Sequence, residues 1–266
     1  MVQLVQPQFS RDLRTLFGPL YELAEQSTRV LGTLAGTFTE KKKRHAIPRF
    51  LFSGPEGGQD SVKIGLFAGL HGDEPAGCTA LVRLLLDLAN DPELATGYDL
   101  MVYPVCNPIG YLSGKRENGR GKDLNREFWR SSIQPEIKIL EAELRLHQFN
   151  GIITLHADDT CDGLYGYAHG ATLNEALLKP ALAVSERFLP RDSRTRIDGF
   201  EANNGIICTC FDGVLAAPPE QHPAPFDIIF ETPANASLDL QVEASLSALH
   251  TILAEYRGFI AQGADL

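Results

Sequence analysis

The residues VKIGLFAGLHGDEPAG at positions 62–77 place a buried strand directly before a helix. The mostly apolar run 62–70 is typical of a strand buried on both faces, and it stops abruptly at His71. Helical spacing of apolar residues follows over residues 76–88. His71 and Glu74 therefore lie at the carboxyl end of a predicted strand, which is where open α/β sheets bind their ligands.

Two further apolar runs end in the same way. Residues 151–155, GIITL, are followed by His156, and residues 226–230, FDIIF, are followed by Glu231. The carboxyl ends of parallel strands meet at one edge of a sheet. We therefore expect these side chains to share a crevice with those of the first run.

Strands alternate with helices along most of the chain, which predicts a single α/β domain. Its sheet should be mostly parallel, mixed and twisted, with helices on both faces. Besides the runs above, we expect strands at residues 50–52 and 99–105 and helices at 134–147, 174–188 and 238–259. The segment 192–225, which is rich in Gly, Pro and Asn, should form short strands and loops that border the site.

The start of the chain is expected to be helical. Apolar residues recur with a helical period from Leu13 to Leu31. We therefore divide the chain into an N-terminal helical segment, 1–44, and an α/β domain, 45–266. The basic run 41–44 is expected to be a solvated turn before the next strand.

Composition excludes several classes of protein. The formal charge of −10 lacks the basic face that nucleic acid or an anionic membrane requires. No apolar run approaches the roughly 20 residues of a membrane span, and no secretory signal is recognisable at the start. Five cysteines form an odd set without paired spacing, which favours a reducing cytoplasm.

Two imidazoles and a carboxylate form a typical ligand set for one catalytic zinc ion, Zn²⁺. His71, Glu74 and His156 would supply three ligands and leave the fourth position for water. Taken alone, Glu74 is also explained as a carboxylate favoured at a helix N-terminus, and both interpretations can hold together. Glu231 then remains available for proton transfer.

A basic, glycine-punctuated loop covers residues 115–126 of this acidic chain. A solvated loop that faces acidic neighbours would explain most of its cations. Arg126 beside Asn125 is better suited to a planar carboxylate, because guanidinium donates two parallel hydrogen bonds and the amide adds another.

Together these residues resemble the zinc carboxypeptidase superfamily, which includes the succinylglutamate desuccinylase/aspartoacylase branch. The resemblance covers about residues 62–233. It rests on four pieces in order, namely HGDE at 71–74, the segment from Arg116 through DLNR at 123–126, the strand-end His156, and Glu231 in FETP.

The resemblance implies that His71, Glu74 and His156 hold the zinc ion. It also implies that Asp123 orients His71 through the other ring nitrogen. The domain 45–266 would thus be a zinc hydrolase domain.

The resemblance further implies roles for four residues around the substrate. Glu231 would take a proton from the attacking water and pass it to the leaving amine. Arg116 would polarise the scissile carbonyl and stabilise the oxyanion. Asn125 and Arg126 would bind a free carboxylate of the substrate.

Two departures from the family limit the substrate prediction. Secreted digestive members carry a tyrosine on a mobile loop before the catalytic glutamate, but this chain has no tyrosine between Tyr167 and Tyr256. Its substrate clamp must differ. His156 is followed by ADDTCD at 157–162, which could select an amino-bearing substrate, admit a second metal, or simply form a solvated loop in which Asp158 caps a turn.

The sequence thus predicts a cytoplasmic, zinc-dependent carboxypeptidase-type hydrolase. Its substrate would be a small molecule or short peptide with an amide bond near a free carboxylate. The first alternative is an N-acyl amino acid deacylase of the succinylglutamate desuccinylase/aspartoacylase type. The second is an inactive zinc-binding module that recognises carboxylates, which the presence of both Glu231 and Arg116 disfavours.

Overall fold

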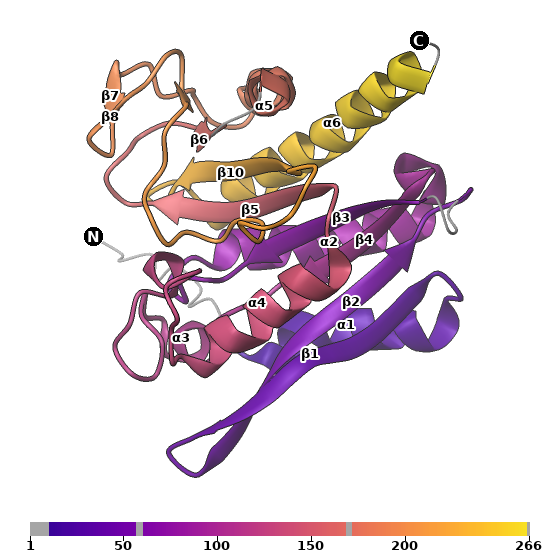
Figure 1. Cartoon of the computed structure of the whole chain (residues 1–266), viewed down its shortest axis with the longest axis vertical. Coiled ribbons are helices and arrows are strands. Elements are labelled where there is room, and N and C mark those ends of the chain that lie inside the picture. Colours follow the sequence, from indigo (N-terminus) through magenta and orange to yellow (C-terminus); the bar gives the residue numbers. More distant parts are fainter. Residues whose placement is uncertain (1–10, 57–60, 169–171, 265–266) are drawn as a thin grey trace, which may run out of the picture.

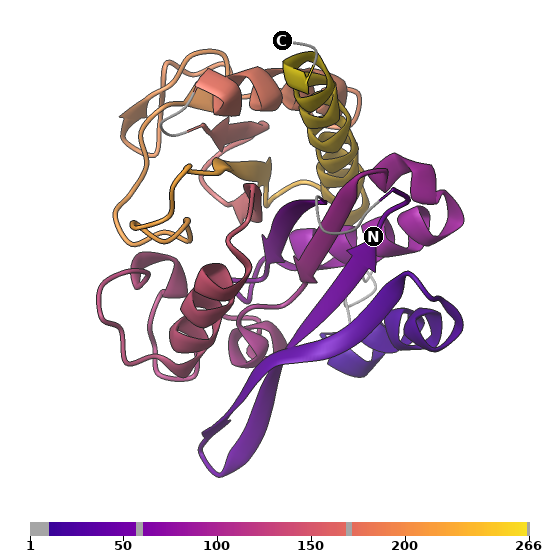
Figure 2. The same cartoon turned by 45° about the vertical axis from the view of Figure 1, so that its right-hand side comes forward.

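An eight-stranded mixed sheet forms the centre of the molecule (Figures 1 and 2). The computed structural model describes residues 11–56, 61–168 and 172–264. The sheet has the order β1-β2-β4-β3-β5-β10-β6-β9. The strands are β1 (Val30–Glu40), β2 (Lys43–Ser53), β3 (Val62–Ala68), β4 (Tyr98–Tyr103), β5 (Gly151–Asp158), β6 (Tyr165–Tyr167), β9 (Ile206–Ile207) and β10 (Phe226–Pro233), with β7 (Arg196–Ile197) and β8 (Phe200–Glu201) in a separate hairpin.

Helices cover both faces of this sheet, as the sequence predicts (Figure 1). The helices are α1 (Leu13–Gln26), α2 (Pro75–Asn90), α3 (Pro108–Ser113), α4 (Pro135–His147), α5 (Thr172–Ser185) and α6 (Leu238–Ala264), with 3-10 turns η1 (Pro92–Ala95) and η2 (Leu124–Arg126). The first core cluster joins one face to α1, α2, α5 and α6, and the second joins the other face to α4. In the described part of the chain, none of these helices is long and apolar enough to cross a membrane.

The central strand β3 shows why the sheet is buried on both faces. It pairs in parallel with β4 on one side and with β5 on the other, and β5 pairs in parallel with β10. Leu66 belongs to the core beneath α2 and α6, whereas the next residue, Phe67, belongs to the core beneath α4. Alternate side chains of a strand point to opposite faces, so an apolar run buries both of them.

The predicted helix does not extend to Leu31. The helix ends at Gln26, and Val30 to Glu40 form β1, which pairs antiparallel with β2. The sequence VLGTLAGTFT is rich in Gly and Thr, which disfavour a helix, and pairing with β2 satisfies its backbone on one side. The domain boundary at residue 44 stays a prediction, but it falls inside β2, which pairs with β1 in the central sheet.

The predicted solvated turn at residues 41–44 is the tip of the β1–β2 hairpin. Lys41 and Lys42 have positive φ angles of 47° and 65°, and both are exposed. Two consecutive left-handed residues match the twist of a tight hairpin.

Candidate metal centre and substrate pocket

His71 and Glu74 lie on the loop between β3 and α2, as predicted. Gly72 is required in this loop, because a Cβ atom there would lie 1.9 Å from the backbone carbon of Gly110 at the start of α3. Arg11, which precedes α1, donates to the carbonyl oxygens of Gly72 and Asp73. The loop is therefore held by two elements that are distant in sequence.

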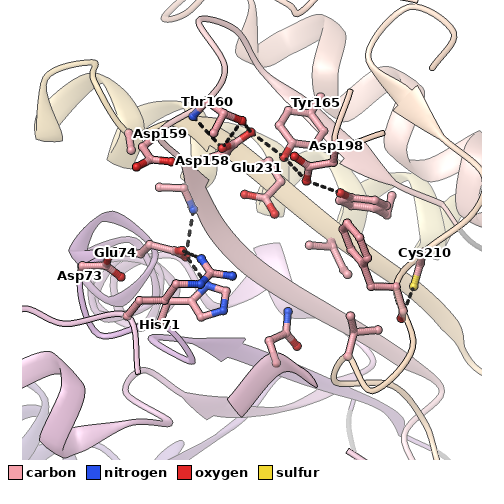
Figure 3. Close-up of a pocket in the computed structure, with 18 of the residues that line it drawn as sticks. His71, Asp73, Glu74, Asp158, Asp159, Thr160, Tyr165, Asp198, Cys210 and Glu231 are labelled. Carbon is pink, nitrogen blue, oxygen red and sulfur yellow. Dashed lines mark hydrogen bonds and ion pairs between the residues drawn. The ribbon is translucent and has the colours of Figure 1, made fainter. Parts of the chain in front are cut away.

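Three donor atoms from two strand ends meet in one place. Nδ1 of His71 lies 2.6 Å from Oε1 of Glu74, and Nδ1 of His156 lies 2.9 Å from Oε2 of the same carboxylate. The two Nδ1 atoms are 3.2 Å apart. All three residues are buried, and the backbone N–H of Ala157 also donates to Glu74. Figure 3 shows His71 and Glu74 along one wall of the pocket.

This donor set fits a divalent zinc ion. Donor atoms around a tetrahedral zinc with bonds of about 2.0–2.1 Å lie roughly 3.3 Å apart, close to the separation of the two imidazole Nδ1 atoms. Among the described residues, His71, Glu74 and His156 are the one set of His, Cys, Asp or Glu whose donor atoms are close enough to hold a cation. The second-metal alternative for residues 158–162 therefore has no such cluster to support it.

Opposing effects set the protonation of the three donors. Burial disfavours the charged ring of His71, but Glu74 and then Asp123 outweigh it and raise its pKa to about 9. Burial opposes the ionised form of Glu74, yet the two imidazoles hold its pKa well below the usual range. Burial lowers the pKa of His156. A cation must therefore displace a proton from His71 in order to bind.

Asp123 connects the donor set to Arg116. Its Oδ1 lies 3.0 Å from Nε2 of His71, and its Oδ2 accepts from Nε and Nη2 of Arg116 at 3.2 and 2.9 Å. Nη1 of Arg116 also lies 3.5 Å from Oε1 of Glu74. Asp123 thus occupies the position from which it can orient His71, and Arg116 faces the pocket beside the donors.

Glu231 lies on β10, directly beside His156 on β5. Strand β10 continues to Pro233 and β5 to Asp158, so both residues lie inside strands rather than after them. Figure 3 shows Glu231 between the His71–Glu74 wall and the Tyr165–Asp198 wall. Burial, followed by the negative charges of Glu74 and Asp158, raises the pKa of Glu231 well above its ordinary value.

The pocket around these groups has a volume of about 370 Å³. All eight residues predicted for the site lie in the pocket or contact its lining. Six line it, namely His71, Glu74, Arg116, Asn125, Arg126 and Glu231, and the other two, Asp123 and His156, contact these. Asn125 and Arg126 come from η2, on the side of the 208–216 loop.

The contacts of Asn125 differ from the predicted role. Its Oδ1 accepts from the backbone N–H of Leu215 at 2.9 Å, and its Nδ2 lies 3.4 Å from Nε2 of His156. The amide therefore joins His156 to a loop that lies 90 residues after Asn125 in the chain. Arg126 is left as the stronger candidate for binding a carboxylate.

The pocket wall opposite His71 and Glu74 contains residues that the sequence analysis did not single out. Oδ2 of Asp198 accepts from the hydroxyls of Tyr167 at 2.6 Å and Tyr165 at 3.2 Å (Figure 3). Tyr165 also donates to Asp158 at 3.0 Å. Asp198 lies in the turn between β7 and β8, inside the segment 192–225 that was predicted to border the site. No periodic pattern marked it, because a two-residue strand is too short to show one.

Asp158 caps a turn, as predicted, and also lines the pocket. Its Oδ1 accepts from the backbone N–H of Thr160 at 2.8 Å, which is the predicted turn cap. Asp158, Asp159 and Thr160 nevertheless line the pocket. The loop is therefore not merely solvated.

The fold is that of the metallocarboxypeptidases. A candidate metallopeptidase from Shewanella amazonensis matches with a TM-score of 0.76 at 24% identity, over 92% of this chain and 93% of that chain. A metallo-carboxypeptidase from Pseudomonas aeruginosa, in complex with (2-guanidinoethylmercapto)succinic acid, matches with a TM-score of 0.69 at 18% identity, over 91% and 68% of the two chains. The predicted fold class is confirmed.

Sequence comparisons show similarity over part of the chain. Residues 60–162 match the family model of the succinylglutamate desuccinylase/aspartoacylase catalytic domain. A stretch of 103 residues is 33% identical to Carboxypeptidase SOL1 of Arabidopsis thaliana, and it covers 33% of this chain but only 21% of that relative's length. The predicted resemblance to the zinc carboxypeptidase superfamily and its succinylglutamate desuccinylase/aspartoacylase branch is confirmed.

Proposed function

We propose that this protein is a zinc-dependent hydrolase of the carboxypeptidase type, which cleaves an amide bond near a free carboxylate in a small peptide or peptide-like substrate. The observation that carries the proposal is one pocket that combines a His–Glu–His donor set with Glu231, Arg116 and Arg126. These groups supply a metal site, a base, a cation for the oxyanion and a carboxylate anchor.

The chain's own residues divide the reaction among them. His71, Glu74 and His156 would hold a zinc ion, which when bound would supply Lewis acidity toward the carbonyl and the attacking water. Glu231 takes the proton of that water and delivers it to the leaving nitrogen. Arg116 lies beside the donors and pairs with the carbonyl oxygen as negative charge develops there.

The alternative is an N-acyl amino acid deacylase of the succinylglutamate desuccinylase/aspartoacylase type. The family match over residues 60–162 supports it, because that match names this branch. A screen of the zinc-loaded protein against dipeptides, murein-type peptides and N-acyl amino acids, measured by release of free amine, separates the two. Release from peptides alone supports the peptidase, and release from acyl amino acids alone supports the deacylase. Zinc binding without release from any class supports the inactive module.

We expect Arg126→Ala to raise KM and leave kcat nearly unchanged. A substrate carboxylate keeps its charge throughout the reaction, so its pairing with Arg126 contributes equally to ground state and transition state. A charged hydrogen-bonded pair contributes about 1.5–3 kcal/mol, which corresponds to a KM increase of about 10- to 150-fold. Steady-state kinetics on the best substrate of the screen measures both constants.

The control is the same substrate with its carboxylate converted to a carboxamide. It should be poor for the wild type and lose little more on Arg126→Ala, because the charge that Arg126 pairs with is already absent. Fully additive penalties would show that the two groups do not meet, and the carboxylate anchor would have to be abandoned.

The acidic wall formed by Asp158 and Asp198 supports a substrate that also carries an amine. Asp198→Asn keeps the shape of the side chain and removes its charge. We expect a KM increase of about 1.5- to 5-fold for amine-bearing substrates, which is the range of a solvent-exposed ion pair. A matched substrate with the amine acetylated should be unaffected. Equal changes for both substrates would rule out recognition of the amine.

We also propose a reducing compartment such as the cytoplasm. Cys78, Cys106 and Cys161 are free thiols that are buried in the described part of the chain. Unpaired thiols persist where disulfides are kept reduced.

A further inference from the structure

The loop formed by residues 211–216, which we name the clamp loop, is fastened to the segment that carries Arg126. The backbone N–H of Leu215 donates to Asn125 at 2.9 Å, and the backbone N–H of Phe128 donates to the carbonyl of Gly213 at 3.1 Å. The indole N–H of Trp129 donates to the carbonyl of Ala216 at 3.1 Å. These contacts join segments that are more than 80 residues apart.

Gly213 allows this close approach. Its φ angle is +79°, and a Cβ atom there would lie 2.4 Å from the carbonyl oxygen of Arg126. Any other residue would be strained at this backbone angle and would push the clamp loop away. The clamp loop therefore lies against Arg126 because of its local sequence.

Phe211 stacks on Arg126 at one end of the clamp loop. The guanidinium carbon of Arg126 lies 4.2 Å from the centroid of the Phe211 ring, and both side chains line the pocket. Phe211 packs edge-on against Phe200 at 4.7 Å, and Phe200 packs edge-on against Tyr167 at 6.3 Å. The ring is therefore held from behind by the wall that carries Asp198.

The guanidinium of Arg126 has N–H donors that are available to a ligand. Nη1 of Arg126 donates to the carbonyl of Asn125 at 2.7 Å, and no described carboxylate lies within ion-pair distance of Arg126. Arg116, by contrast, is paired with Asp123. Stacking covers one face of the planar guanidinium and leaves its N–H edge available for a carboxylate in the same plane.

We propose that Phe211 is a positioning residue that orients Arg126 for a substrate carboxylate, and that the clamp loop thereby determines carboxylate selectivity. The inference rests on the proposed function for the role of Arg126. Phe211 would act through the guanidinium of Arg126, on which it stacks.

The test compares Phe211→Leu with Phe211→Tyr in the zinc-loaded protein. Leucine keeps apolar bulk and removes the ring, whereas tyrosine keeps the ring. The probes are 3-phenylpropanoate and 3-phenylpropanamide, measured by calorimetry; neither has an amide bond beside a free carboxylate, so binding is scored without hydrolysis. Emission from Trp129, the single tryptophan, reports whether the clamp loop stays docked.

The preference is the ratio of the affinity for the carboxylate probe to that for the carboxamide probe. We expect this ratio to fall about 3- to 30-fold in Phe211→Leu, as loss of a cation–π contact implies. Phe211→Tyr should stay within about twofold of the wild type. With a hydrolysed substrate, KM for the carboxylate form should rise while kcat holds. A purely structural role would instead weaken both probes equally and shift the Trp129 emission, and that result overturns the proposal.

The outcomes separate this inference from the hydrolase proposal. If nothing is hydrolysed but Phe211→Leu abolishes a measured carboxylate preference, the inference stands and the hydrolase proposal fails. If hydrolysis occurs and Phe211→Leu keeps the wild-type preference, the inference fails and the hydrolase proposal stands. A wild-type protein without any carboxylate preference overturns the inference.

Discussion

Glu231→Gln should lower kcat by about 10²- to 10⁴-fold, the usual span for a general acid–base group, while zinc content and melting temperature stay close to the wild type. Glutamine preserves the shape of the side chain but cannot accept the proton of the attacking water. Glu231 also has a raised pKa, so its basic form is populated only as pH rises through that value. The wild-type kcat should therefore increase as pH rises through the pKa of Glu231, and the kcat of Glu231→Gln should not show this increase.

Asp227→Asn is the matched control. Asp227 lies on the same strand, and burial raises its pKa to about 7, but it does not line the pocket. We expect its kcat to remain within a few-fold of the wild type. If Glu231→Gln is equally mild, the base is another group, and Asp158 and Asp159 become the next residues to test.

His156→Ala should lose stoichiometric zinc at concentrations that saturate the wild type, and hydrolysis should fall to background. Zinc binding to a three- or four-ligand site contributes about 10–16 kcal/mol, so loss of one ligand removes on the order of 3–5 kcal/mol, or about 10²- to 10⁴-fold in Kd. Competition with a chromogenic chelator measures the Kd. Chelation of the wild type should abolish hydrolysis, and one equivalent of zinc should restore it.

Asp123→Asn provides a graded comparison for that experiment. Asp123 contacts the outer nitrogen of His71 rather than the centre of the donor set. A change in such an orienting partner typically costs 10- to 100-fold in metal affinity, which should be less than the loss in His156→Ala. Zinc bound at unchanged affinity in His156→Ala, or full activity in the metal-free wild type, would contradict the metal site.

The site residues at strand ends were predictable because local patterns determine their placement. A buried parallel strand requires a continuous apolar run, and the first polar residues after it must leave the sheet at its carboxyl edge. His71 and Glu74 follow from that rule without knowledge of the strand order. His156 and Glu231 were expected from it too, but β5 and β10 continue past them to Asp158 and Pro233, so they lie near the strand ends and still inside the strands. The order β3-β5-β10 then makes these ends adjacent.

Local apolar spacing also explains an error, because the start of β1 was wrongly predicted as the end of a helix. Apolar spacing over Val30 and Leu31 is compatible with either period, and pairing with β2 decided the outcome. Partner strands lie outside any sequence window, so local periodicity cannot weigh them.

By itself, the sequence determined the α/β class, the donor set His71, Glu74 and His156, and the placement of Glu231, because each depends on a run of neighbouring residues. Only the tertiary structure decided what surrounds them. Contacts across the fold turned Asn125 toward Leu215, placed Phe211 on Arg126 and brought Asp198 to the pocket wall. These contacts join irregular loops to distant segments, and irregular loops carry no hydrophobic period from which their partners can be inferred.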